Sequence, residues 1–176
     1  TNPGVKDGNE YSDPITPQVR AIDALNPFDE AITRARNAGF TTCYTGPGSA
    51  NVIGGVGLSM KLRGHTAEEM ALEGSEQMKF ALGENPKRFY GLQNKMPVTR
   101  MGTAALMRQT LTEAKDYSDK LLAFEVGTGK KPENDFKLNA LVRVVRGLQR
   151  CRIHCHRSDD IITALRIAHE FHLDFT

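Results

Sequence analysis

The sequence has little cysteine, little net charge and no long hydrophobic run. Its three cysteines, Cys43, Cys151 and Cys155, cannot all pair with one another and stand in apolar runs typical of strands, so no disulfide framework is expected. No run approaches the roughly 18 to 20 apolar residues of a membrane span, so we expect no membrane partner. The 23 Lys and Arg against 21 Asp and Glu leave a net charge of +2 with mixed signs along the chain, so we expect no nucleic-acid partner.

The two ends of the sequence differ from those of a complete domain. The first residue is Thr1, the first 27 residues contain four prolines and no apolar period, and an apolar run only begins at Leu173. We therefore expect the 176 residues to be a piece of a longer protein. No signal-like segment opens the chain, and the sequence leaves the localisation unknown, with the cytoplasm favoured.

What the chain does contain is a series of short apolar runs that alternate with amphipathic helical periods. Strands are predicted at 41–45, 58–62, 78–82 and 151–156, with a fifth beginning at 173. Helices are predicted at 27–38 with Asn26 as cap, at 66–76, from Thr99 onward, at 135–145, and after a Ser158 cap. Residues 1–26 are predicted to be an irregular lead, 83–86 a loop fixed by Pro86, and 127–134 a surface linker. This alternation predicts parallel strands in an α/β sheet or barrel, within one partial domain spanning 1–176.

The most distinctive polar pattern is the pair His154 and His156. In a strand, alternate residues share a face, so both imidazoles would lie together at the carboxyl end of a parallel strand. Imidazole nitrogens bind divalent metals, and α/β folds place their ligands at that end. The alternative is a hydrogen-bonded polar cluster with no metal.

Two further candidates belong to the preceding strand. Glu84 follows its carboxyl end, and Lys79 lies inside it. A lysine buried in a strand is costly unless it has a partner such as a metal or a carboxylate. The alternatives are a turn or cap role for Glu84 and a solvent-facing Lys79. The glycine-rich residues 46–57 either allow close approach of a ligand or form a tight connection.

Taken together, these segments resemble the metal-dependent amidohydrolases, in the branch related to imidazolonepropionases and Xaa-Pro or arginine dipeptidases. The resemblance spans nearly the whole chain in order. It is carried by residues 26–29 (NPFD), 39–42 (GFTT), 47–55 (PGSANVIGG), 81–88 (ALGENPKR), 99–102 (TRMG) and 154–161 (HCHRSDDI).

The resemblance implies a TIM-like barrel of which this chain covers roughly strands 2 to 6 of eight. It implies that His154 is the metal ligand of strand 5, that Glu84 or, as second choice, a carboxylated Lys79 is the ligand of strand 4, and that His156 contacts the substrate. The implied cofactor is a divalent metal, most simply zinc, whose activated hydroxide attacks the carbonyl of an amide-type C–N bond. The implied partner is a small amide or dipeptide-like substrate, and a homo-oligomer is compatible with the family.

The chain departs from the family pattern in its ligand set. The HxH pair of strand 1 would precede Thr1, the histidine of strand 6 would follow Thr176, and the aspartate of strand 8 is absent. Because catalytic zinc usually needs three protein ligands, we expect the chain alone to be inactive. The alternative function is a non-catalytic α/β module that binds a ligand or a partner.

Overall fold

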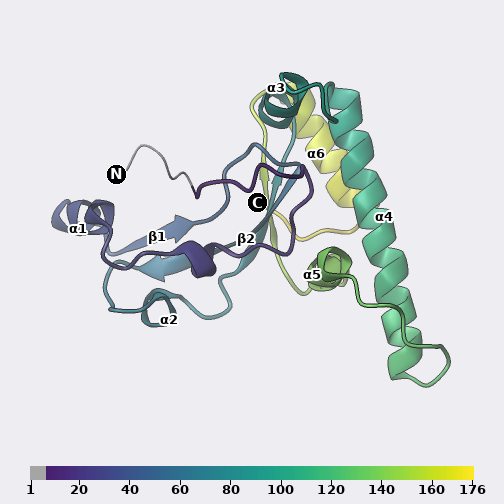
Figure 1. Cartoon of the computed structure of the whole chain (residues 1–176), viewed down its shortest axis with the longest axis horizontal. Helices are drawn as coiled ribbons and strands as arrows, with labels where there is room; N and C mark the ends of the chain where they lie inside the picture. Colours follow the sequence, from purple (N-terminus) through teal and green to yellow (C-terminus); the bar gives the residue numbers. More distant parts are fainter. Residues whose placement is uncertain (1–6) are drawn as a thin grey trace.

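A four-stranded sheet runs through the centre of the computed structural model, which describes residues 7–176. Residues 1–6 of the expected irregular lead lie outside the described residues. The strands follow one another in the order β1 (Thr42–Thr45), β2 (Ile53–Lys61), β3 (Gln77–Ala81) and β4 (Cys151–His154) (Figure 1). Residues 174–176 add backbone hydrogen bonds along β4, where the fifth strand was predicted.

The prediction of parallel strands is correct for one pair and wrong for two. Strands β3 and β4 are parallel, whereas β2 is antiparallel to both β1 and β3. A parallel pair needs a long crossover, usually a helix. Three helices separate β3 from β4, whereas no helix separates β1 from β2, and only the four-residue α2 (Ala67–Met70) lies between β2 and β3.

The larger helices lie on one side of the sheet. Helices α4 (Arg100–Glu125), α5 (Phe136–Val145) and α6 (Ser158–Glu170) are grouped at the right of Figure 1, with α3 (Glu84–Gly91) at the top. The 3₁₀ turn η1 (Ala21–Ala24), α1 (Glu30–Asn37) and α2 lie toward the other end. No helix in residues 7–176 combines the length and apolarity that a membrane crossing requires.

The helices predicted from Thr99 and over 135–145 are confirmed, and each begins with a side-chain cap. Thr99 accepts a hydrogen bond from the Gly102 amide, and Asp135 accepts one from the Leu138 amide. Residues 126–134 between these helices form turns and coil.

Other predicted boundaries were wrong for local reasons. Asn26 caps only a turn, by accepting from the Phe28 amide, and the first α-helix begins after Asp29, which accepts from the Ala31 amide. Phe28, which lies inside the predicted helix, therefore precedes α1 and is exposed. The loop expected at Pro86 is instead the first turn of α3. Proline, which has no N–H group, is tolerated there because the first residues of a helix donate no intrahelical hydrogen bond.

Further differences concern the length of elements. The predicted helix 66–76 is reduced to α2, which Thr66 caps. Strand β2 begins inside the glycine-rich segment, and strand β4 ends at His154 instead of residue 156. Helix α6 begins at Ser158 itself, with Arg157 at the cap position.

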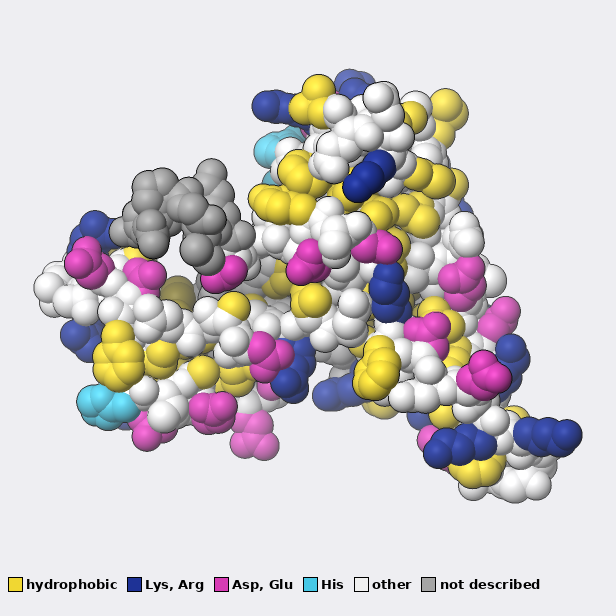
Figure 2. Space-filling view, in the orientation of Figure 1, with side chains coloured by type: hydrophobic (Ala, Val, Ile, Leu, Met, Phe, Trp, Pro, Cys, Tyr) yellow, Lys and Arg dark blue, Asp and Glu magenta, His cyan; other side chains and the backbone are white. Residues whose placement is uncertain are grey.

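The hydrophobic core lies between the sheet and the three large helices. Met78 and Phe80 of β3 lie in register with Cys151 and Ile153 of β4, so these four side chains share one face. They pack with buried residues of the helices, among them Met107, Leu111, Leu141, Val144 and Ile167. A second, smaller cluster at the end of β2 contains Met60, Leu62 and Met70. On the face seen in Figure 2, acidic and basic side chains are interspersed over the surface.

Candidate functional site

The opposite face of the β3–β4 pair carries the polar residues. Lys79 lies in register with Arg152, and Ala81 lies in register with His154. Because Lys79 and Ala81 are two residues apart, as are Arg152 and His154, all four side chains point away from the hydrophobic core. The sheet therefore places a lysine and a histidine, both predicted as metal ligands, on the same face of neighbouring parallel strands.

His154 is the last residue of β4 and is half-buried. Its Nε2 lies 3.1 Å from the amide Nδ2 of Asn85, which donates to it in the tautomer that leaves Nε2 unprotonated. Burial, followed by the charges of Lys79 and His156, lowers the pKa of His154. The neutral imidazole, which is the form that ligates metals, is thereby favoured.

His156 lies beyond the end of β4 and is exposed. Its ring nevertheless stays close to that of His154, with centroids 4.5 Å apart and an interplanar angle of 84°. The two imidazoles meet as predicted, but through the turn after the strand rather than by strand alternation.

Lys79 is a buried lysine with only 7% of its surface exposed. Its Nζ donates to Ser49 Oγ at 2.8 Å and to the Phe80 carbonyl at 3.2 Å. Burial, and secondarily the charge of Arg152, lowers the pKa of Lys79 to about 8. A substantial share of neutral amine is therefore available at mildly alkaline pH, and only that form can react as a nucleophile.

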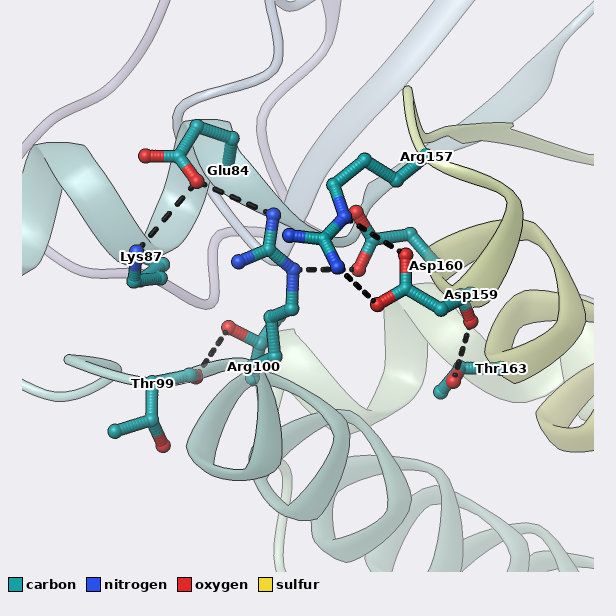
Figure 3. A network of polar contacts seen from close by, with 9 residues as sticks. Glu84, Lys87, Thr99, Arg100, Arg157, Asp159, Asp160 and Thr163 are labelled. Atoms are coloured by element: carbon teal, nitrogen blue, oxygen red, sulfur yellow. Dashed lines mark hydrogen bonds and ion pairs between the residues drawn. The ribbon is translucent and has the colours of Figure 1, made fainter.

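Glu84 occupies a different position from the other three candidates. It is the first residue of α3, and its Oε2 lies 3.2 Å from Arg100 Nη2 and 3.5 Å from Lys87 Nζ (Figure 3). The Lys87 charge, and less strongly that of Arg100, lowers the pKa of Glu84. Its ion pair with Arg100 thus directs the carboxylate toward α4, while the next residue, Asn85, contacts His154.

Three residues around the site were missed as functional candidates from sequence. Ser49 contacts Lys79, Asn85 contacts His154, and Arg100 contacts Glu84. Each contact joins residues at least 16 positions apart in the chain. Asn85 alone carried a local signal, because it directly follows Glu84 at the carboxyl end of a predicted strand.

The glycine-rich segment approaches its own chain. Gly55 has a φ of +110°, and a Cβ there would collide with the backbone of Val19, which lies alongside β2. A Cβ on Gly54 would meet Pro47 at 3.2 Å and the Lys79 side chain at 3.8 Å. These contacts favour the tight connection over a ligand cradle.

The donor set for a metal is partial. Within residues 7–176, no group of three or more His, Cys, Asp or Glu side chains lies close enough to hold a metal ion. His154 and His156 lie together, and Lys79 shares the face of His154. This set falls short of the three protein ligands that catalytic zinc usually has, unless Lys79 is modified to an anionic ligand.

No family model matches the chain. A comparison with solved structures finds a crystal structure of an amidohydrolase from Thermotoga maritima MSB8, with a TM-score of 0.92 and 42% sequence identity. The matched region covers 98% of this chain and 46% of the Thermotoga chain. A curated protein, amidohydrolase tasK from Hapsidospora irregularis, is 34% identical over 96% of this chain.

This chain spans less than half of either relative, namely 46% of the solved structure and 19% of tasK. At 42% identity and a TM-score of 0.92, the Thermotoga protein shares both sequence and fold with nearly all of it. Since both relatives are named amidohydrolase, the comparisons support an amidohydrolase family for this chain.

Proposed function

We propose that this chain supplies part of a metal-dependent site that hydrolyses an amide-type C–N bond in the intact protein. The observation that carries the proposal is the placement of Lys79 and His154 on one polar face, at and before the carboxyl ends of parallel strands. In α/β barrels, catalytic groups gather at that end of the strands. We further propose a TIM-like barrel as the fold of the intact protein, in the branch related to imidazolonepropionases and Xaa-Pro dipeptidases.

Among the proposed metal ligands, His154 is the first choice, and Lys79 is preferred to Glu84 as the ligand of strand 4. Lys79 shares the face of His154, whereas the carboxylate of Glu84 is engaged by Arg100 and Lys87. The remaining ligands would come from parts of the protein outside these 176 residues, so the chain alone is expected to be inactive. When bound, zinc lowers the pKa of a water ligand and polarises the substrate carbonyl.

The residues of this chain have separate proposed roles. Burial lowers the pKa of His154, which favours the neutral ring that can offer a lone pair to a metal. Asn85 donates to Nε2 of His154 and so orients the ring for as long as this nitrogen holds no metal. His156, exposed beside it, is placed to contact a small amide or dipeptide-like substrate.

The proposal is tested by metal analysis of the natural full-length protein. Zinc should be present in stoichiometric amount and should be lost in His154→Ala, while the control His169→Ala, on the exposed surface of α6, retains it. Comparing Lys79→Ala with Glu84→Ala distinguishes the two strand 4 candidates, because only the true ligand's loss removes zinc. A full-length protein that binds no divalent metal would instead favour the non-catalytic binding module.

A further inference from the structure

Three helix N-termini meet beside the candidate site. Glu84 is the first residue of α3, Arg100 is the first residue of α4, and Asp160 lies in the first turn of α6. The Arg100 guanidinium contacts both carboxylates, with Nε 2.9 Å from Asp160 Oδ1 and Nη2 3.2 Å from Glu84 Oε2 (Figure 3). One side chain thus connects α4 both to the preceding helix α3 and to α6, which follows later in the chain.

Arg100 occupies an electrostatically unfavourable position on its own helix. A helix N-terminus carries partial positive charge and normally attracts acidic residues. The first turn of α4 contains no acidic residue, and a cation stands at its first position. The two carboxylates from α3 and α6 offset this unfavourable placement, which indicates that the role of Arg100 lies in the contacts between elements.

The Asp160 contact is the stronger of the two. The Asp160 side chain is 5% exposed, and its Oδ2 has no hydrogen-bond partner among the described residues. That oxygen packs against the backbone of Gly83, which has a φ of +79°. A buried carboxylate without a cation is costly, so Arg100 stabilises the position of Asp160 on Gly83. The Glu84 side chain is 45% exposed, so its ion pair is screened by water.

The two contacted segments are the loops that frame the candidate site. Gly83 and Glu84 follow β3 and lead directly to Asn85, whose amide contacts His154. Asp160 follows the turn after β4, six residues after His154 in the chain. The two loops also share a backbone hydrogen bond, from the Leu82 amide to the His154 carbonyl at 2.9 Å.

We propose that Arg100 is a positioning residue, which bridges Glu84 and Asp160 and thereby fixes the loops after β3 and β4 around His154. It contacts neither of the two histidines, and it acts through Asn85 and the backbone of these loops. The consequence for catalysis rests on the proposed function, since it assumes that His154 serves a metal. The coupling between the two loops does not depend on that assumption.

Hydrogen exchange of the natural full-length protein tests the coupling. Arg100→Gln should accelerate amide exchange in both 82–86 and 154–158 by about tenfold, because it removes the cation from a buried carboxylate. Glu84→Gln should accelerate only 82–86, by about two- to fivefold, because that pair is exposed. The matched control is Arg108→Gln, which removes an exposed ion pair between α4 and Glu170 and should leave both loops unchanged.

Unchanged exchange in both loops of Arg100→Gln would overturn the proposal, and so would equal acceleration throughout the chain, which indicates only a loss of global stability. If Arg100→Gln does not fold, the test falls to Glu84→Gln, which changes an exposed side chain. Unaltered exchange of residues 82–86 in Glu84→Gln would contradict the proposal that Arg100 bridges Glu84 and Asp160.

A cobalt-substituted protein separates this inference from the proposed function. The visible absorption bands of bound cobalt should change shape in Arg100→Gln and stay the same in Arg108→Gln. If the wild type binds no cobalt but Arg100→Gln still loosens both loops, the metal site fails and the positioning role stands. If cobalt binds and its bands are identical in Arg100→Gln, the positioning of His154 is contradicted.

Discussion

At the scale of single residues, Lys79 lies in an environment that opposes its charge. It is buried on the polar face of β3, and its partners are one hydroxyl and one carbonyl rather than a carboxylate. A folded-state pKa of about 8 against an ordinary value of 10.5 means that the folded protein holds the Lys79 ammonium less readily than the unfolded chain does. Such a site costs stability, which is typical of a functional position.

Lys79→Met should therefore stabilise the metal-free chain at pH 7, by about 1 to 3 kcal/mol. The gain in stability should be full below pH 8 and should shrink between pH 8 and 10.5. In that range Lys79 has lost its proton in the folded wild type but keeps it in the unfolded chain, so the stability of the wild type rises with pH. Urea unfolding at pH 7 and pH 10 measures both effects. Lys61→Met, at an exposed position in β2, is the control; an equal gain there would show that burial of Lys79 is not the cause.

Gly83 offers a second test, with Gly74 as a matched control. Both glycines have similar positive φ values, +79° and +73°, but a Cβ on Gly83 would collide with the Asp160 carboxylate, whereas nothing lies within 4 Å of a Cβ on Gly74. Gly74→Ala should cost about 1 kcal/mol through backbone strain alone. Gly83→Ala should cost at least about 2 kcal/mol more, because it also disrupts a buried ion pair. Thermal unfolding compares the two, and equal costs would contradict the close packing of Asp160 on Gly83.

The residues of the site differ in how well sequence predicts them. Lys79 and His154 could be singled out as candidates, Lys79 because it is a charged residue in a short apolar run and His154 because His156 follows it two residues later. Arg100 and Ser49 could not, since their significance depends on contacts with residues from other elements. A serine in a glycine-rich loop and an arginine at a helix start have ordinary explanations until the fold brings their partners together.

At the scale of elements, prediction succeeded where local rules act alone. Helices α4 and α5 combine an apolar period with a side-chain cap, so their starts were evident. Strand β2 was underestimated because its first half is rich in glycine, which weakens strand propensity. Its glycines are required by close approach of Val19 at a register irregularity between Ile53 and Gly55, a contact that no local pattern reveals. The antiparallel pairing of β2 was not predicted either, because no local pattern in the sequence reveals it.

The cap of α4 carries a prediction at this scale. Thr99→Ala removes the hydroxyl that accepts from the Gly102 amide at 2.9 Å. We expect a loss of about 1 kcal/mol in unfolding free energy, since an alanine cannot satisfy this first-turn donor. Thr128→Ala, in the exposed turn after the same helix, is the control and should change stability by less than about 0.5 kcal/mol. Chemical denaturation of both variants gives the comparison, and a loss of similar size in the control would contradict a specific capping effect.

At the scale of the whole molecule, the two faces of the sheet differ in what covers them. Helices α4, α5 and α6 bury one face in the main hydrophobic core, while the other carries Lys79, Arg152 and His154. Arg152 is held on that face by Gln77 and by the ring of Tyr44, 4.0 Å from its guanidinium carbon. A polar face of this kind suits the interior of a ligand-binding barrel better than a second hydrophobic layer. The Thermotoga relative has further chain beyond the 46% that this chain spans.

The projecting end of α4 leads to the final prediction, which concerns association. This end and the loop after it extend from the rest of the molecule at the lower right of Figures 1 and 2. There Leu122, Phe124 and Val126 are 51%, 44% and 64% exposed. Exposed apolar groups on a projecting helix favour contact with a second copy, so we expect the 176-residue chain to self-associate. Its apparent mass should rise above 19.4 kDa with concentration in sedimentation experiments.

Replacing Leu122 and Val126 together by lysine should shift this equilibrium toward the monomer, because association would then bury two charges. Leu92→Lys, at an 80% exposed position after α3, adds a charge away from the projection and should leave the equilibrium nearly unchanged. A wild-type chain that sediments as one 19.4 kDa species at every concentration would contradict self-association. If the wild type and the double variant associate equally, the contact lies on another surface. The polar face of the sheet and the outer edge of β1 are then the next surfaces to test.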